Sequence, residues 1–342
     1  MWALASITFP SRGNPYDPMK TRLFCLTIVL GSHLQSTALE LWVSPAGSDA
    51  GDGSRKQPVK ELSTALRMVR ESRRLKKVGD SETAEIKLTG GTHHVSRTLL
   101  VRPEDSGSAT SPTIIAAAGG ERPVLSGGVP VTGWRKVSEK IDGLPEASCG
   151  KVWCAESART GGRILEFRQM WVNGAKAVRA RTPNGESMAR LLAWDTKAEE
   201  AWIPVDSLAS VRDPGLAEMV IHQQWAIAIC RISSIDIEAK GARVRFHEPE
   251  GKIQFEHPWP QPVISPNGNS PFFLTNAIEF LDEPGEWFQD PQTGRIYYMP
   301  RPGEEMNGAE VIVPALETLV RITGSFDRPV QHLHFKGISF QH

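Results

Sequence analysis

The sequence has no excess of charge of either sign and no long apolar run. Its 342 residues contain 39 Lys and Arg against 39 Asp and Glu, which gives a net charge of zero. A chain without net charge has no general attraction for nucleic acid or an anionic membrane surface. The longest apolar run, Leu23 to Gly31, has nine residues, whereas a membrane-spanning helix needs about 20. Neither a nucleic-acid partner nor a membrane span is expected.

Cysteine and metal-ligand patterns are also sparse. The chain has four Cys, and it contains neither a CxxC pair nor an HExxH motif, so no structural zinc, metal or cofactor is predicted. Cys149 and Cys154 are close enough in sequence for a small loop disulfide, with buried free thiols as the alternative. His93 and His94 would point to opposite faces of a strand. His332 and His334 can share a face, but no third ligand lies near them.

The N-terminal segment has the order of a secretory signal peptide. Lys20 and Arg22 precede the apolar run, and the small residues 36–38 follow it. This order predicts a leader over residues 1–38, with the signal peptide at about 19–38 and export to the periplasm or the medium. Translation could start at Met1 or at Met19. A buried amphiphilic strand is the alternative.

Glycine and proline are abundant, and one segment has a helical period. Thirty Gly and 25 Pro favour a turn-rich β protein. Leu62, Ala65, Leu66 and Val69 fall on one face at helical spacing, and Pro58 is expected in the first turn. The predicted helix ends in a basic outer face. Such a face is more typical of a solvated helix end than of a nucleic-acid site.

Short apolar segments recur on both sides of this chain's middle. Ile86 to Ile114 spans 28 residues and Leu99 to Val124 spans 25. Spacings of 22 and 19 residues return at the far end, from Val311 to Leu333 and from Leu319 to Ile338. Repeats of this length indicate stacked parallel strands. Residues 39–129 are therefore assigned to a cap helix and first coils, and residues 309–342 to resumed coils.

The middle of the chain, residues 130–308, has a different pattern. An Asn173-Gly174 pair joins the strands 167–172 and 175–181, and this pair favours a type I′ hairpin. A second hairpin is expected around the turn at 290–294, and residues 219–237 alternate as an antiparallel strand or strand pair should. An inserted antiparallel β-domain is the prediction.

Seven segments taken together resemble one family. They read, in order, WVSPAGSDAGDG, PVKELSTALRMVR, TGGTHHVSRTLLVRPEDSGS, GERPVLSGGVPVTGW, RQMWVNGAKAVRARTPN, AIEFLDEPGEWFQDPQTGRIYYMPRPGE and VIVPALETLVRITG. They resemble the secreted bacterial right-handed parallel β-helix glycosidases, in the group of α-L-fucosidases and xylanases with related β-xylosidases. The resemblance implies an all-β, pectin-lyase-like parallel β-helix with an N-terminal capping helix, an inserted antiparallel domain and an active site formed by later coils.

The residues considered for sugar contact lie in the middle region. The face of Trp225, Ile227 and Ile229 is expected to be core, with His222, Gln224, Ala226, Ala228 and Cys230 on the other face. The functional alternative places a sugar subsite at His222, Trp225, Arg231, Glu286 and Trp287. The acidic cluster Asp282, Glu283, Glu286 and Asp290 is expected to serve turns and caps, and Glu248 and Glu250 to be solvated.

Glycoside hydrolysis needs two carboxyl groups across the scissile bond, and sequence spacing identifies no such pair. The sequence, with its resemblance, predicts the N-terminal part of a secreted hydrolase of plant or algal polysaccharide, with its catalytic carboxylates beyond residue 342. A partner protein is expected only if one covers the open end of the β-helix. The alternatives are a non-catalytic carbohydrate-binding or assembly module, and a polysaccharide lyase.

Overall fold

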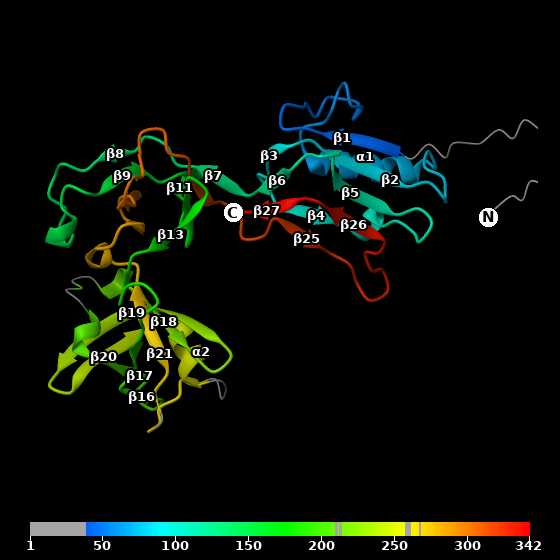
Figure 1. Cartoon of the computed structure of the whole chain (residues 1–342). Coiled ribbons are helices and arrows are strands. Elements are labelled where there is room, and N and C mark those ends of the chain that lie inside the picture. The colour runs from blue at the N-terminus through cyan, green and yellow to red at the C-terminus, as the bar shows by residue number, and fades with distance from the viewer. Residues whose placement is uncertain (1–38, 209–210, 212–213, 257–260, 267) are drawn as a thin grey trace, which may run out of the picture. The chain divides into compact units, whose positions relative to one another are not determined.

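The computed structural model describes residues 39–208, 211, 214–256, 261–266 and 268–342 (Figure 1). The predicted leader, residues 1–38, lies outside the described residues, so the signal peptide and the start site stay predictions. The described part is mostly β, with two α-helices, α1 (Leu62–Arg74) and α2 (Glu250–Glu256). No helix within it is long and apolar enough to cross a membrane.

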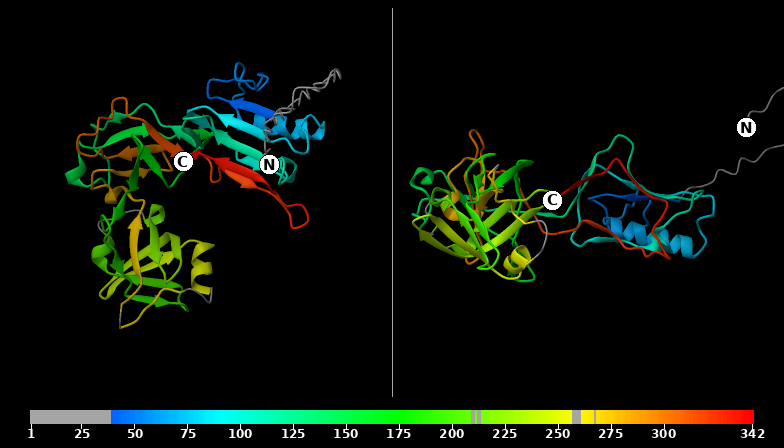
Figure 2. Two further views of the ribbon diagram at one scale, coloured as in Figure 1. Left: turned by 45° about the vertical axis from the view of Figure 1, so that its right-hand side comes forward. Right: turned by 90° about the horizontal axis from the view of Figure 1, so that it is seen from below.

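Three of the sheets are built from parallel strands alone. The first has the order β1-β2-β5-β26, from strands Leu39–Val43, Ala84–Leu88, Thr113–Ala117 and Leu333–Lys336. The second has the order β3-β6-β27, from strands Gly91–His94, Pro123–Ser126 and Ser339–Gln341. The third pairs β4 (Leu99–Val101) with β25 (Val320–Ile322). Figure 2 shows these strands in two further views.

Apolar residues of neighbouring parallel strands occupy matching register positions. Leu41, Ile86, Ile115 and Phe335 occupy one register position across the first sheet, and the first three of them are buried. The alternate residues of β2, Glu85 and Lys87, are only half-buried. Each short strand therefore covers its apolar side chains with those of its neighbour, which a single three- to five-residue strand could not do alone.

The predicted spacing of the strands was right in kind and wrong in detail. Ile86 pairs with Ile115 rather than Ile114. Leu99 pairs with Val320, far away in the sequence, rather than with Val124. The chain leaves the parallel region after β6 and returns to it as β25, so local spacing could not reveal this partner.

The helix prediction is confirmed, and its start is corrected. The buried face of α1 consists of Leu62, Ala65, Leu66 and Val69, as the spacing predicts. Helix α1 packs beside β1 and β2 (Figure 2). Pro58 lies before the helix in an extended segment, because the helix begins only after its N-cap residue Glu61.

Two antiparallel strands mark where the chain leaves and re-enters the parallel region. β7 (Gly128–Pro130) pairs with β24 (Val311–Pro314). The segment at Val311, expected among the parallel strands, thus belongs to an antiparallel sheet, where Val311 faces Val172. That sheet has the order β7-β24-β12-β13-β22-β23-β9-β8. Its other strands are Met170–Val172, Ala175–Arg179, Glu286–Gln289, Arg295–Tyr298, Trp153–Glu156 and Arg135–Lys136.

The second antiparallel sheet curls around the largest apolar core, with strand order β14-β21-β18-β19-β20-β17-β16 and β15 joined to β21. In that order its strands are Arg181–Thr182, Pro271–Thr275, Glu218–His222, Ile227–Glu238, Gly241–Phe246, Glu200–Ile203 and Ala193–Asp195, and β15 is Ala189–Arg190. The 12-residue β19 pairs with β18 at its start and with β20 at its end, across a bulge between Ile232 and Ser234. A bulge of this kind bends a strand and lets one sheet curl.

The remaining elements are short. β10 and β11 (Arg159–Thr160 and Arg163–Ile164) form a two-stranded sheet. The 3-10 helices are Pro103–Asp105, Glu146–Ser148, Val205–Leu208, Pro214–Leu216 and Ile278–Phe280.

The three predicted strand pairs of the middle region are confirmed. β12 and β13 form the first hairpin, and Asn173 and Gly174 both have positive φ, as a type I′ turn requires. β22 and β23 form the second hairpin. The long alternating segment is the antiparallel pair β18 and β19.

Candidate functional site

Three large apolar side chains are exposed in the turn between β18 and β19 and in the first residues of β19. Trp225 is 59% exposed, Ile227 60% and Ile229 46%. Single exposed apolar side chains are normal, but three large ones within five residues are the kind of group that marks a binding surface. We call Trp225, Ile227 and Ile229 the apolar strip.

The sequence predicted this face to be core, and the structure reverses that assignment. Ala228 and Cys230 point inward and are buried, while the larger Ile227 and Ile229 that alternate with them point out. The reason lies on the neighbouring strand, where Met219 faces Cys230 and Ile221 faces Ala228 across the pair. Bulky side chains on β18 fill the interior beside the start of β19, which has room only for small ones there, whereas Ile232 further along β19 is buried.

Aromatic and basic side chains continue the outer face beyond the apolar strip. His222 faces Ile227 across β18 and β19, and its ring centroid lies 6.1 Å from that of Phe273 on β21. The guanidinium of Arg181 stands 3.7 Å from the centroid of Phe273, in cation–π contact. Burial lowers the pKa of Arg181. The predicted site residue His222 is thus half-buried beside an aromatic ring.

Polar groups border the apolar strip at both ends. At the turn, the Gln223 amide donates to the Gln254 side-chain oxygen at 3.0 Å. On β19, Arg231 donates to both carboxylate oxygens of Glu250, with Nε–Oε1 at 2.5 Å and Nη2–Oε2 at 3.0 Å. This bidentate pair lowers the pKa of Glu250 to about 2. Glu250 is therefore an ionised, fixed acceptor, and not simply solvated as the sequence suggested.

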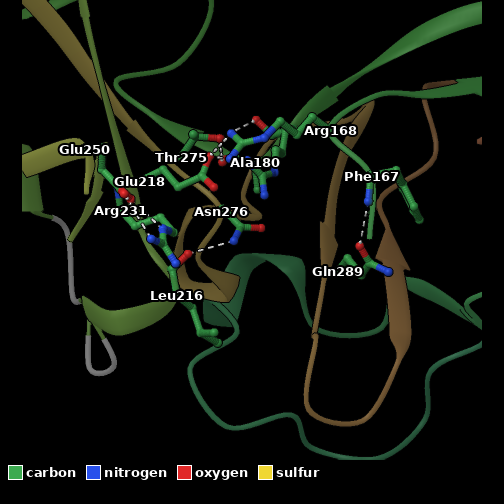
Figure 3. Close-up of polar contacts among 11 residues, drawn as sticks. Phe167, Arg168, Ala180, Leu216, Glu218, Arg231, Glu250, Thr275, Asn276 and Gln289 are labelled. Atoms are coloured by element: carbon green, nitrogen blue, oxygen red, sulfur yellow. Dashed lines mark hydrogen bonds and ion pairs between the residues drawn. The ribbon is translucent and has the colours of Figure 1, made fainter. Parts of the chain in front are cut away.

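Glu218 lies beside Arg231 across the strand pair and forms a second charge cluster. Its carboxylate is almost buried, at 5% exposure, and its Oε2 accepts from Nη1 of Arg168 and of Arg179, each at 2.5 Å. Figure 3 shows Arg168 and Glu218 turned toward each other, with Arg231 and Glu250 in contact nearby. Burial lowers the pKa of Arg179. This cluster ties β18 to the β12–β13 hairpin.

Glu286 was predicted both for turn capping and as a possible sugar contact, and the structure gives it a capping geometry. Its carboxylate accepts from the backbone N–H of Asp282 at 3.2 Å and of Glu283 at 3.1 Å, and from the N–H of Arg181 at 3.2 Å. Burial raises the pKa of Glu286 to about 7. Asp290 caps its own turn by accepting from the backbone N–H of Gln292 at 2.8 Å.

Trp287 is placed in the core rather than at a surface. It is fully buried, at 0% exposure, and its ring stacks on Phe167 with centroids 4.9 Å apart. Its indole nitrogen has no hydrogen-bond partner among the described residues. The predicted site residues thus fall into two groups: His222, Trp225 and Arg231 share an outer face of the curled sheet, and Glu286 and Trp287 lie buried in the other antiparallel sheet.

The structure places the histidine and cysteine candidates as follows. His93 is buried and His94 exposed, so the two point to opposite faces as predicted. His332 lies outside any strand. The three cysteines within the described residues, Cys149, Cys154 and Cys230, form no disulfide. No group of three His, Cys, Asp or Glu suited to a metal was found in the described part.

Sequence reasoning missed Arg168, Arg179, Glu218 and Phe273. Arg168 and Arg179 lie on the two predicted strands of the Asn-Gly hairpin. The sequence therefore predicted their positions, but it did not predict their shared partner, Glu218. Glu218 is separated from them by about 40 to 50 positions along the chain, and only the packing of β18 against the hairpin brings them together.

Comparisons with known proteins bear on this site. Residues 150–301 match the family model described as the GH141 insertion domain. A solved structure titled "Glycoside hydrolase" is 44% identical to this chain, with a TM-score of 0.80 over 89% of this chain and 51% of that one. Over most of its length, this chain is similar to a solved glycoside hydrolase. It spans about half the length of that solved relative.

Two further comparisons add little. A structure titled "The complex structure of XylC with xylose" is 13% identical, with a TM-score of 0.38 over 88% of this chain and 35% of that one. That likeness is too low to carry an argument. The search of curated proteins found no match. The antiparallel sheets and the candidate site fall largely within the segment that matches the GH141 insertion domain.

Proposed function

We propose that this chain forms part of a secreted glycoside hydrolase that acts on plant or algal polysaccharide. The observation that carries the proposal is the 44% identity and TM-score of 0.80 with a solved glycoside hydrolase. The match of residues 150–301 to the GH141 insertion domain supports it. Export rests on the signal-peptide pattern of the leader.

The architecture we propose is a right-handed parallel β-helix, pectin-lyase-like, that carries an inserted domain. The three parallel sheets and the stacked register of Leu41, Ile86 and Ile115 support the β-helix. The pairing of β7 with β24 supports an insertion that leaves and re-enters at one place. The proposed division is a cap and first coils at 39–129, an insertion at 130–308 whose antiparallel sheet also takes in β24, and coils that resume after β24 within 309–342.

The proposed sugar-contacting surface is the outer face around the apolar strip. Trp225 offers an exposed ring for the apolar face of a sugar, and His222 and the Arg231–Glu250 pair offer polar groups for hydroxyls. Glu286 and Trp287 are buried in the other antiparallel sheet and are not part of this surface.

The carboxylates of this region have roles other than hydrolysis. Hydrolysis needs one carboxyl group that gives up a proton and a second that attacks or activates water. The carboxylate of Glu218 is engaged by two arginines. The pair with Arg231 lowers the pKa of Glu250 to about 2, so Glu250 stays ionised. The proposal therefore leaves the acid and base to other residues.

Isothermal titration with xylo-oligosaccharides and fucosylated oligosaccharides, together with a reducing-end assay on the parent polysaccharides, tests the proposal. We expect binding of one of these glycans, and Trp225→Ala should weaken it about tenfold, the size of one lost aromatic contact. Trp42→Ala is the matched control, because Trp42 lies on β1 in the parallel region. That variant should bind as tightly as the unchanged protein.

The outcomes bear on the competing functions. Binding without turnover agrees with a hydrolase whose acid and base are supplied by other residues, and also with a carbohydrate-binding or assembly module. Release of reducing ends by this chain would overturn the expectation that its catalytic carboxylates lie elsewhere. Products with unsaturated, ultraviolet-absorbing ends would point to a lyase. Absence of both binding and turnover across the glycans would contradict the proposal, and unchanged binding by Trp225→Ala would remove the apolar strip from the site.

A further inference from the structure

A separate cleft lies in the parallel region, between α1 and the strands β3 and β4. Its volume is about 670 Å³, within the range of about 300 to 1,000 Å³ typical of small-molecule sites. Buried aliphatic side chains from three segments of the chain form its deepest part: Leu62 and Leu66 of α1, Leu99 of β4 and Leu125 of β6. This cleft is distinct from the apolar strip and shares no residue with it.

One buried polar group in this cleft has an unsatisfied atom. His93 lines the cleft and is only 5% exposed. Its Nε2 lies 2.8 Å from the carbonyl oxygen of Thr89, and since a carbonyl can only accept, Nε2 carries the proton. Nδ1 is buried and has no hydrogen-bond partner within the described residues.

The state of the imidazole decides what Nδ1 can do. Burial lowers the pKa of His93, which favours the neutral ring at neutral pH. With Nε2 protonated, Nδ1 of a neutral ring is a bare acceptor. A buried acceptor without a partner costs about 1 to 3 kcal/mol. Because Nδ1 has almost no solvent access, a ligand hydroxyl reaches it only if the His93 ring turns toward the cleft, and that contact would relieve the cost.

The exposed edge of the cleft is basic. Lys60, Arg67 and Arg97 line it, and none of them makes an ion pair within the part of the chain that the structure describes. Arg70 also lines the cleft, but its guanidinium is bound to the buried Asp105, with Nε–Oδ1 at 3.0 Å. Glu61 is the single carboxylate there. This local excess is not a consequence of composition, because the whole chain has a net charge of zero.

We propose that this cleft binds a glycan segment that carries carboxylates, such as an oligouronate. The basic edge attracts the carboxylates, and the acceptor at Nδ1 of His93 takes a sugar hydroxyl. The leucines contact the C–H groups of the sugar rings. An aliphatic carboxylate fits the leucines and the basic edge but brings no hydroxyl for His93. The choice of a glycan as the ligand rests on the proposed polysaccharide substrate. The evidence that this cleft is a ligand site does not depend on that proposal.

Titration with a tri-galacturonate, its methyl ester and a saturated fatty acid tests this inference. We expect the tri-galacturonate to bind, and the uncharged ester to bind at least about tenfold more weakly, because it has lost its charge-assisted hydrogen bonds. Arg67→Ala combined with Arg97→Ala should weaken binding about tenfold or more. Lys77→Ala, beyond the end of α1 and outside the cleft, is the matched control and should leave binding unchanged.

A second measurement locates the ligand. Addition of tri-galacturonate should shift the Nδ1 resonance of His93, and His93→Leu should weaken binding while thermal unfolding shows that the variant is folded. Equal binding of the charged trimer and its ester, unchanged binding by the Arg67/Arg97 double variant, or binding of the fatty acid alone would overturn the inference. These results leave the proposed hydrolase untouched, since its test uses neutral glycans and a variant on the other sheet.

Discussion

The parallel strands and the curled antiparallel sheet use the same two-residue alternation with opposite results. In β2, Ile86 and Leu88 are buried, and Lys87 between them is half-buried. In β19, Ile227 and Ile229 are the exposed residues, and the small Ala228 between them is buried. Alternation determines which residues share a face, and the neighbours of a strand determine which face is inside.

The two kinds of sheet differ in how much interior space the neighbouring strands leave for the side chains of a given strand. In the parallel sheets each strand meets a copy of its own pattern, so Ile86 lies next to Ile115 and both fill the interior. In the curled sheet the interior already holds Phe272, Leu274 and Met219 from β21 and β18. The first residues of β19 therefore turn the small Ala228 and Cys230 inward and the larger Ile227 and Ile229 to the surface, while Ile232 beyond them is buried.

The largest expected effect is a direct test of this contrast. Ile86→Ala should lower the free energy of unfolding by about 3 kcal/mol, because it opens a cavity between stacked strands. Ile229→Ala, the same chemical change at a residue that is 46% exposed, should cost less than about 1 kcal/mol. Urea unfolding of both variants measures the difference. Equal losses would show that the exposed face of β19 is covered in solution.

A second comparison uses one buried carboxylate from each region. Glu218→Gln leaves the buried guanidinium of Arg179 without its counter-charge, and Asp105→Asn removes the counter-charge of Arg70, whose side chain is 30% exposed. Glu218→Gln should destabilise the protein by about 3 kcal/mol, because a buried charge loses its partner, and Asp105→Asn should cost less, because water reaches Arg70. Arg168→Gln should cost under about 1 kcal/mol, since that side chain is 53% exposed. A large loss for Arg168→Gln would mean that all three groups act as one network.

Glu286 provides a pH-dependent test within the antiparallel region. Its pKa in the folded protein is raised to about 7 by burial, from an ordinary value of 4.5. A raised pKa means that its contribution is fully present below about pH 4.5 and is lost as the pH rises through about 7. Relative to Glu286→Gln, the unchanged protein should lose on the order of 3 kcal/mol over this interval.

Thermal unfolding of both proteins at several pH values between 4 and 8 measures this difference. A stability difference that does not change with pH would show that the carboxyl group titrates normally.

The smallest expected effect concerns the ion pair at the border of the apolar strip. Arg231→Gln should raise the pKa of Glu250 from about 2 toward its ordinary value of 4.5. Because the folded pKa is lowered, the stabilisation is present above about pH 4.5 and is lost as the pH falls toward 2. The pair is partly exposed, so its loss should cost under about 1 kcal/mol at neutral pH. NMR titration of the Glu250 carboxyl carbon checks the shift, and an unchanged pKa would show that backbone donors hold it.

Local patterns were sufficient for several elements. The spacing of Leu62, Ala65, Leu66 and Val69 predicted the buried face of α1, and Asn173-Gly174 predicted the hairpin of β12 and β13. Each signal depends only on residues that are close in sequence, within two turns of an α-helix or within a single β-turn. The partner of Leu99 could not be read in this way, because the chain passes through both antiparallel sheets before β25 returns to it.

The sequence identified several residues of the candidate site but not which of them are exposed. His222, Trp225 and Arg231 were found from the alternating segment, but the same pattern did not show that Trp225 is exposed and Trp287 buried. Both tryptophans lie next to apolar residues in sequence, and burial depends on what packs against them in space.

The sequence by itself determined the turn-rich β class, the helix, the hairpins and the faces that each strand offers. These follow from backbone preferences and residue period, which act over a few neighbouring positions. The tertiary structure alone decided which face of β19 meets solvent, and that Glu218 joins Arg168 and Arg179. It also left Nδ1 of His93, in a basic cleft, without a hydrogen-bond partner among the residues that the structure describes. Packing and charge pairing depend on segments that are distant along the chain, and only folding brings those segments into contact.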